Sequence, residues 1–580
     1  MSQQIEAAPD AIAQIQSVAA AEVAAMPVSP GAQAIDRLDV HEPSKPRSST
    51  RLFAILAPLY LVLFIAALDQ TIVATAVPSI SAALQSASGY TWIGGAYLLA
   101  NAAASPLWAK ASDIWGRKPA LLAAVVFFAV ASALAASAPL IPVLIAARAL
   151  QGVAGGAIMQ LVSVVLADLF SPRRRALYIG LLGLVWAVAA AAGPLVGGAL
   201  TELAGWRWCF WINLPVCGTA FILLLLFLDV HNPQTKLREG LVAVDWFGAV
   251  SILAVTLLVL LGLNFGGVTF PWASPKVICL IAAGAAMIGF FLYSEKRLAK
   301  YPLMPLSMFK DRSTNAAIIV AFAHSMVSVG VEYYLPLYFQ SVQLASPLRS
   351  GLYIMPMMVT EAATDVLSGI LIHRTGRYRE VAWAGALIMT LGMGLYVLAF
   401  HTDTPVSRVL GLEVVGGVGT ALLFQTPLLA VQNAVRQSDT ASATAASGLV
   451  RNLASALSVI VGGVVFQNGM AARRASLMAA GVKGPVLAAL SDGQAAAHVG
   501  VAREIGDPVQ RRAVRDAFAG SVRNIFVLYT CAAGVTVLVS LFWKHRQLRT
   551  DHVETKTGIA TLSKREDVTS VSVTDNHGVV

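Results

Sequence analysis

The chain has 580 residues, of which 57% are hydrophobic and only 12% are charged, and its mean hydropathy is +0.70. This composition excludes a soluble enzyme and indicates a polytopic, all-α membrane protein. The net charge of +10 would suggest nucleic-acid binding in a soluble protein, but the bases lie mostly in short loops between apolar runs. We therefore expect no nucleic-acid partner.

Apolar runs of about 20 residues, the length that crosses a bilayer, begin shortly after residue 50. Residues 1–50 are rich in Ala, Gln, Pro and Ser and predict a disordered cytosolic tail, and the polar residues 547–580 predict a second one. Fourteen spans are expected, near residues 52–78, 90–110, 119–138, 141–168, 176–200, 207–229, 245–264, 275–295, 314–340, 349–372, 381–400, 408–432, 442–467 and 525–543.

The charges of the loops orient these spans. Even-numbered spans are followed by clusters of bases and odd-numbered spans by none or one, so the positive-inside rule places both tails in the cytosol. The clusters are Lys110, Arg117 and Lys118; Arg173, Arg174 and Arg175; Lys236 and Arg238; Lys296, Arg297, Lys300 and Lys310; Arg374, Arg377 and Arg379; and Arg436.

One loop disagrees with this rule. Residues 468–524 should be extracellular, yet they carry seven arginines. Their Ala-rich, charged pattern predicts amphipathic helices that lie at the outer surface. The arginines are Arg473, Arg474, Arg503, Arg511, Arg512, Arg515 and Arg523.

Two ionisable residues lie inside predicted spans of the first half. Asp69 is in the first span, where a carboxylate must pair or face water, and Arg148 is in the fourth, where a guanidinium needs an acceptor. We predict that Asp69 is a protonatable group lining a central cavity, with Arg148 as its partner; alternatively, Asp69 bonds to Thr71 or to backbone near a helix end. Gln151 lies one turn beyond Arg148 on the same face. The nearby glycines leave room for a neighbouring helix: Gly152, Gly155 and Gly156.

A charged turn follows the second span, in the sequence AKASDIWGRKPAL from Ala109 to Leu121. Asp113, Gly116, Arg117 and Lys118 lie between two apolar runs, and Gly116 permits a sharp turn. This stretch resembles the loop between spans two and three of the major facilitator superfamily, with Ala109 in place of the first Gly of that pattern.

The turn recurs in the second half as GILIHRTGRYR, with Gly376 matching Gly116, Arg377 matching Arg117 and His373 standing where Asp113 does. The resemblance implies two six-helix bundles with substrate held between them. We expect an N-terminal bundle (51–230), an inserted two-helix linker (231–300) and a C-terminal bundle (301–546). Such an inserted pair is typical of the fourteen-span drug:proton antiporters.

Further motifs carry the same resemblance. LDQTIV, from Leu68, is similar to the first-span motif of the fourteen-span antiporters, with Ala74 in place of its Asn, and Arg148 with Gly152 matches the fourth-span signature, whose Arg is implicated in proton coupling. The fifth-span sequence AGPLVGG resembles the antiporter signature of exporters, with Ala189 at its first Gly. That motif comprises Gly193, Pro194, Gly197 and Gly198.

Two segments flank these motifs. Asp168 ends the fourth span and is predicted to pair with Arg117 or Arg175, either as a latch on the cytoplasmic side or as a solvated ion pair. The run WRWCFWINLP, from Trp206 to Pro215, predicts an aromatic belt at the membrane interface, with no chemistry assigned to it.

The second half contains further polar residues within spans. His324 and Glu332 lie two turns apart in span nine, and Glu361 and Asp365 one turn apart in span ten. The spacing leaves cavity lining and polar packing open. Arg451 in span thirteen resembles a recurrent Arg of the antiporter branch and suggests a structural clamp.

The sequence therefore predicts a proton-coupled antiporter that exports small hydrophobic compounds such as toxins, secondary metabolites or drugs. Vacuolar uptake of basic amino acids, a siderophore carrier and a non-transporting membrane sensor remain alternatives. No P-loop, zinc spacing or nucleophile elbow occurs, so we expect no enzyme, metal or cofactor. We expect a monomer in the plasma membrane, or alternatively the vacuolar membrane, with substrate, protons and lipid as partners.

Overall fold

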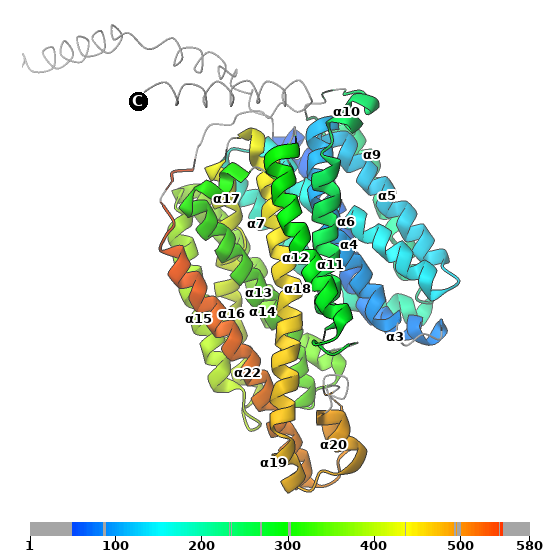
Figure 1. The fold of residues 1–580 in the computed structure, drawn as a ribbon, viewed down its shortest axis with the longest axis vertical. Coiled ribbons are helices and arrows are strands. Elements are labelled where there is room, and N and C mark those ends of the chain that lie inside the picture. The colour runs from blue at the N-terminus through cyan, green and yellow to red at the C-terminus, as the bar shows by residue number, and fades with distance from the viewer. Residues whose placement is uncertain are drawn as a thin grey trace, which may run out of the picture. The chain divides into compact units, whose positions relative to one another are not determined.

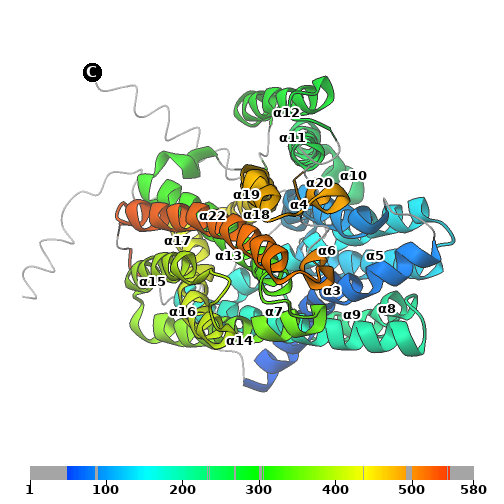
Figure 2. The ribbon, with the colours of Figure 1, turned by 90° about the horizontal axis from the view of Figure 1, so that it is seen from below.

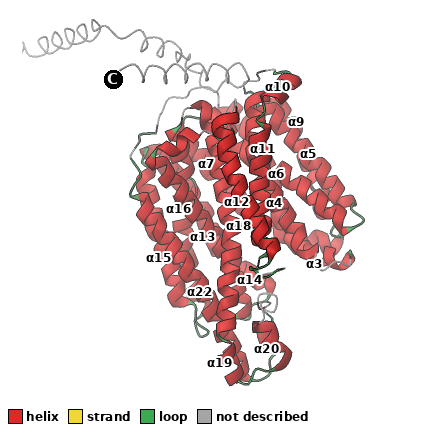
Figure 3. Ribbon diagram, in the orientation of Figure 1, coloured by secondary structure: helices red, strands yellow, loops and turns green. Residues whose placement is uncertain are grey.

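The computed structural model describes residues 49–548, except residues 85–88, 231, 232, 234, 267–269, 300–302, 305, 436, 492–494, 496–499 and 545. Nearly all of the two predicted tails, with Lys300 and Arg436 among the loop bases, therefore lie outside the described residues. Figure 1 shows long helices that run side by side, and Figure 3 shows that the regular structure of the described part is helical.

The first half forms one helix for almost every predicted span. Its sixth span is split at Ile212, because Pro215 lies in the first turn of the following helix and has no backbone N–H to continue the preceding one. The bounds are α3 Ser49–Ala83, α4 Gly89–Trp115, α5 Arg117–Ser137, α6 Ile141–Leu169, α7 Pro172–Leu203, α8 Trp208–Trp211 and α9 Asn213–Phe227. The inserted segment comprises α10 Leu237–Ala243, α11 Trp246–Phe265 and α12 Pro275–Tyr293, which continues into η1 Ser294–Leu298.

The second half repeats this plan. Its fourth span is split at Gln425, just before Pro427 in the first turn of the next helix. The bounds are η2 Leu306–Lys310, α13 Arg312–Ser341, α14 Pro347–Thr375, α15 Tyr378–Ala399, α16 Val406–Phe424, α17 Thr426–Ala434, η3 Gln437–Asp439, α18 Thr440–Ala472, α19 Arg474–Ala479, α20 Gly484–Ser491, α21 Val501–Glu504 and α22 Pro508–Ser540.

Among the described residues, 13 helical segments are long and apolar enough to cross a membrane. They match thirteen of the fourteen predicted spans. The remaining predicted span is α4, whose polar side chains Asn101, Ser105 and Lys110 make it less apolar. The predicted all-helical membrane architecture is confirmed.

The helices α4 and α6 pack at very close range because of glycine. A Cβ atom on Gly152 would overlap the backbone of Tyr97, and one on Gly156 would lie 2.6 Å from the carbonyl oxygen of Asn101. Gly155 meets the Tyr97 ring in the same way. The prediction that these glycines admit a neighbouring helix is therefore confirmed.

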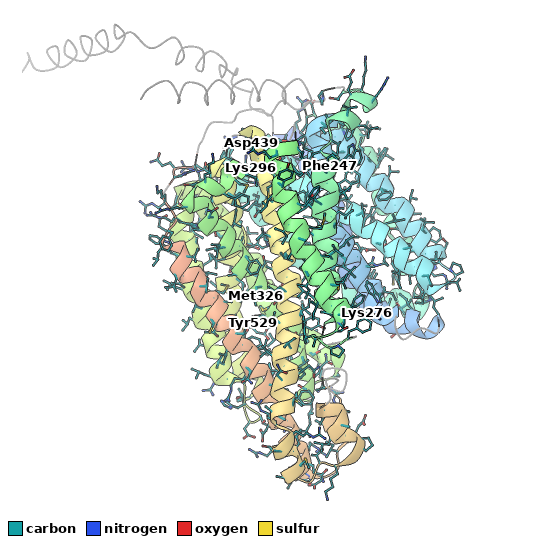
Figure 4. The ribbon with its side chains drawn as sticks, in the orientation of Figure 1. Phe247, Lys276, Lys296, Met326, Asp439 and Tyr529 are labelled. Atoms are coloured by element: carbon teal, nitrogen blue, oxygen red, sulfur yellow. The ribbon has the colours of Figure 1, made fainter. Side chains whose placement is uncertain are left out.

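The inserted helices lie outside the two bundles. Helix α11 packs against α4 of the first half and α18 of the second, and α12 packs against α11. Figure 2 shows the pair on one side of the other helices, and Figure 4 shows Phe247 and Lys296 near one end of it and Lys276 near the other. Because α11 contacts both halves, the insertion bridges α4 and α18 from outside.

Helix α18 is held to α13 and α22 by hydroxyl groups. Ser458 of α18 donates to the carbonyl oxygen of Met326 at 2.5 Å and lies 3.0 Å from the hydroxyl of Tyr529. Gly330 of α13 leaves the space that the Tyr529 ring occupies. Figure 4 labels Met326 and Tyr529 beside α18. These contacts join three helices at one level of the second bundle.

The prediction for the start of the last span was wrong. Helix α22 begins at Pro508 rather than near residue 525, so the end of the predicted 468–524 loop is part of a continuous helix. Its apolar side is buried at Val514, Phe518 and Val522, while Arg515 donates to the carbonyl oxygen of Val342 at 2.7 Å. The arginine-rich segment thus contains helices, as its Ala-rich, charged pattern predicted, but its end is the amphipathic first half of α22 rather than part of a loop.

Candidate functional site

The two buried ionisable residues of the first bundle form an ion pair. Asp69 of α3 has no exposed surface, Arg148 of α6 is 1% exposed, and Arg148 Nη1 lies 2.5 Å from Asp69 Oδ2. The predicted partnership is therefore observed in the structure. Thr71 does not bond to Asp69; it donates to the carbonyl oxygens of Leu68 and Ala189 instead.

Two amides complete the surroundings of Asp69. Gln151 donates to Oδ1 at 3.2 Å, and Asn213 of α9 donates to the same oxygen at 2.8 Å. Both amides also donate to the hydroxyl of Ser132 on α5. Four helices of the first half thus supply this cluster, and sequence reasoning missed Asn213, because it stands inside an aromatic run to which no chemistry was assigned.

Aromatic rings close over the cation. The guanidinium of Arg148 lies 4.5 Å from the centre of the Tyr97 ring and 5.9 Å from that of Phe210, and its Nε donates to the carbonyl oxygen of Ile93. In this conformation Asp69 therefore does not line a cavity, contrary to the prediction, because donors and rings enclose it within one bundle. Removing one partner of such a buried pair typically costs about 3–5 kcal/mol.

The charged turn after α4 folds into a second buried network. Arg117 lies 2.6 Å from Asp113 and 2.7 Å from Asp168, and its side chain is 2% exposed. Of the two partners expected for Asp168, the structure selects Arg117, and the pair is buried rather than solvated. Gly116 has a φ of 100°, which explains why glycine stands there. Lys118 lies apart and donates to the carbonyl oxygen of Leu225 near the end of α9.

The two halves meet on the predicted cytoplasmic side, at the ends of α7 and α14. Arg173 of α7 donates to the carbonyl oxygen of His373 at 2.7 Å and also to that of Arg374. The matching turn glycine, Gly376, has a φ of 72°, as the repeat with Gly116 requires. Arg175 reaches Gln432 of α17 at 2.9 Å. These contacts hold the halves together at this end.

In the Gly-Pro segment of α7, only one of the positions whose contacts are described packs closely against another helix. Gly193 lies against Thr71 of α3, where a side chain would overlap the Thr71 hydroxyl. The carbonyl oxygen of Gly197 lies 3.8 Å from the sulfur of Cys209, and a Cβ on Gly198 would meet no atom within 4 Å. The helix continues through Pro194, and it packs tightly at Gly193 but not at Gly198.

The polar residues of the second half fall into two groups. His324 is 2% exposed and its Nε2 lies 2.9 Å from the carbonyl oxygen of Thr420, so polar packing describes it best. Glu361 is half-buried and accepts a hydrogen bond from the Thr420 hydroxyl at 2.6 Å. Glu332 of α13 is exposed, and its charge acts electrostatically on that of Glu361.

Three further ionisable side chains of this half have few or no hydrogen-bond or ion-pair partners that would stabilise their charge. Arg451 donates to Ser325 and stacks over Phe424 at 4.6 Å, without an ion pair among the described residues. Asp365 is 5% exposed and lies against α7 of the first half. Glu413 of α16 has no exposed surface, and neither of its carboxylate oxygens has a hydrogen-bond partner of ordinary geometry. Sequence reasoning missed this residue, although an acid inside a predicted span was itself a sufficient signal.

Comparisons with known proteins agree with this architecture. Residues 59–459 match the family model described as Major Facilitator Superfamily. The chain is 42% identical to "MFS-type transporter ppz2" of Metarhizium majus over 529 residues, covering 91% of this chain and 90% of that protein. It is 40% identical to "Efflux pump dotC" of Dothistroma septosporum over 512 residues, covering 88% and 87%, and 36% identical to "Efflux pump FUS6" of Gibberella moniliformis over 429 residues, covering 74% and 76%.

Two solved structures share the fold at low sequence identity. The human organic anion transporter MFSD10 matches with a TM-score of 0.55 and 15% identity, covering 86% of this chain and 100% of that one. The proton:xylose symporter XylE matches with a TM-score of 0.54 and 17% identity, covering 90% and 100%. At these identities the similarity concerns the arrangement of helices alone.

Proposed function

Because the chain belongs to the major facilitator superfamily and is a multi-pass membrane transporter, we propose that it exports small hydrophobic organic compounds in exchange for protons. The cargo class follows from relatives that are named efflux pumps and resemble this chain over most of its length. The Gly193–Pro194 segment, which resembles the antiporter signature, supports export over uptake.

The observation that carries proton coupling is the buried pair of Asp69 and Arg148. An ion pair enclosed in a low-dielectric interior cannot gain a proton without consequence, since protonation of Asp69 leaves the Arg148 cation buried and unpaired. Arg148 must then rely on Gln151 and the Ile93 carbonyl, which lie beside it, or move to reach water. Protonation is thereby tied to a rearrangement of α3 against α6.

The proton gradient supplies enough free energy for this exchange. One proton entering the cell yields about 2.3 kcal/mol per 100 mV, and about 1.4 kcal/mol more for each unit of pH difference. Together these support a cargo concentration ratio on the order of a hundredfold or more.

A second candidate cargo is cationic. Glu332 is exposed, Glu361 is half-buried, and the two carboxylates interact electrostatically, so the second bundle offers two acids to a cation. Such a pair favours a basic amino acid or another organic cation over a neutral compound. Transport of cationic and neutral compounds by Glu332→Gln, compared side by side, separates the two cargo classes.

The test of the proposed function is efflux from a yeast strain that lacks its own pumps, with a panel of toxins, with and without a protonophore. The native chain is expected to lower toxin accumulation only while the proton gradient persists. Asp69→Asn should reach the membrane yet fail to drive efflux, whereas Glu239→Gln, at an exposed acid paired only loosely with Lys236, should behave as the native chain. Normal proton-dependent efflux by Asp69→Asn would refute the coupling role of the pair.

A further inference from the structure

Asp365 occupies a notch between the two halves. It lies on α14 of the second half and is 5% exposed, while α7 of the first half presents two glycines to it. A Cβ on Gly180 would lie 2.6 Å from the Asp365 carbonyl oxygen, and one on Gly183 would overlap the carboxylate oxygen Oδ2. The carboxylate therefore fills the place that a side chain on α7 would otherwise take.

This carboxylate has no compensating partner. Among the described residues, no side chain donates a hydrogen bond to it or forms an ion pair with it, and Oδ1 is buried without any partner. Gln425 uses its amide on the Asp365 backbone carbonyl and on the hydroxyl of Ser368 instead. An ionised carboxylate in such a position is strongly destabilising, whereas a neutral one is tolerated.

The charged groups around Asp365 do not change this conclusion. Glu361, one turn earlier on the same helix, repels it, and Arg451 of α18 attracts it without contact. Helix α7 contributes glycine backbone at the notch, α16 ends in the neutral Gln425, and the His324 ring of α13 is engaged with the Thr420 carbonyl. The notch thus contains no cation that neutralises Asp365.

The notch exists only while the halves are joined on the predicted cytoplasmic side. Gly369, one turn beyond Asp365 on α14, lies against the carbonyl oxygen of Ala176, and Arg173 holds the carbonyl oxygens at the end of α14. If α7 and α14 separate, the Asp365 carboxylate is uncovered to water, where ionisation carries no such penalty. The two arrangements therefore differ in the charge that Asp365 can bear.

We propose that Asp365 must hold a proton for α7 and α14 to close, so that closure of the cytoplasmic side binds one proton and opening releases it to the cytosol. The bond that forms and breaks is the O–H bond of the Asp365 carboxyl, and water on the opened side is the acceptor. This inference rests on the proposed function in one respect, the alternation of the two halves, and it assigns to Asp365 a proton separate from that of Asp69.

The test measures closure directly. In a chain freed of its native cysteines, Gln432→Cys places a small thiol at a position that is 3% exposed and joined to Arg175 across the halves. Inside-out vesicles are treated with a membrane-impermeant maleimide between pH 6 and pH 8. Each rate is divided by the rate of the same thiol in the unfolded chain at that pH, which removes the intrinsic reactivity of the thiolate.

The normalised rate should rise with pH in the native background, approaching about tenfold per pH unit, because the open form binds one proton fewer. With Asp365→Asn it should stay at the low-pH value and vary less than about twofold across the range. Glu380→Gln, at an acid paired with Arg379 near the same end, serves as the matched control and should keep the full response. A native pH response in Asp365→Asn would overturn the proposal.

A second variant covers the case in which Asp365→Asn does not reach the membrane. Gly183→Ala places a methyl group where the carboxylate now lies, so the thiol should react rapidly at every pH. A low rate at pH 6 in that variant would equally overturn the proposal. Neither measurement requires efflux, so failure here leaves the role of Asp69 intact, and loss of coupling at Asp69 leaves this readout unaffected.

Discussion

Asn213→Ala is the most informative change in the first half. The Asn213 amide donates to Asp69 Oδ1 at 2.8 Å and to the hydroxyl of Ser132 at 3.1 Å. A hydrogen bond to a charged group contributes about 1.5–3 kcal/mol, so its loss should lower the free energy of unfolding by about that amount and slow proton-driven efflux.

The assays are denaturant titration in detergent and the initial rate of transport into inside-out vesicles with an imposed proton gradient. Asn101→Ala is the matched control, since Asn101 is also a buried amide of the first half but donates to the sulfur of Met159 rather than to Asp69. An equal loss in both variants, or no loss in Asn213→Ala, would show that the amide does not support the pair of Asp69 and Arg148.

Two further changes test the packing of the first bundle. Arg117→Ala leaves two buried carboxylates without their cation and should lower the free energy of unfolding by about 3–5 kcal/mol in denaturant titration. Lys118→Ala, at a half-buried lysine that donates only to the Leu225 carbonyl among the described residues, should lower it by less than about 1 kcal/mol. Gly152→Val forces a side chain into the Tyr97 backbone and should abolish folded protein in the membrane, while Gly198→Ala, which meets no atom within 4 Å, should express normally; size-exclusion profiles in detergent distinguish these outcomes.

The spans and the polar turns were predictable because local composition determines them. A run of apolar residues must lie in lipid, and Gly116 and Gly376 both adopt a positive φ because their turns recur at the same place in each half. The pairing of Asp69 with Arg148 was predictable for a related reason: few other partners exist for a charge inside a span.

The remaining features depend on contacts that composition does not encode. Asn213 lies 144 positions from Asp69 in the chain, and its aromatic neighbours conceal its role. The arginines before residue 525 resemble those of a solvated loop, yet Arg515 is occupied by the carbonyl oxygens of Val342 and Thr402. Whether an arginine meets water or a helix end is decided by tertiary packing, so the start of α22 could not be read from the sequence.

In this conformation, the surroundings of Asp69 and those of Asp365 suit different charge states of the two carboxyl groups. Asp69 is buried beside the Arg148 cation and two donor amides, which compensate a negative charge, whereas Asp365 is buried beside glycine and an amide that does not bond its carboxylate, so a neutral carboxyl is tolerated there. Under the two proposals, the closed arrangement with Asp69 ionised therefore needs a proton on Asp365 alone. A proton that reaches Asp69 breaks the pair with Arg148, and one that leaves Asp365 opposes closure, so each transfer destabilises the closed state by a different route. Asp365→Asn should therefore keep the efflux that the proton gradient drives through Asp69 but lose the dependence of closure on cytosolic pH, whereas Asp69→Asn and the double variant should both fail to drive efflux.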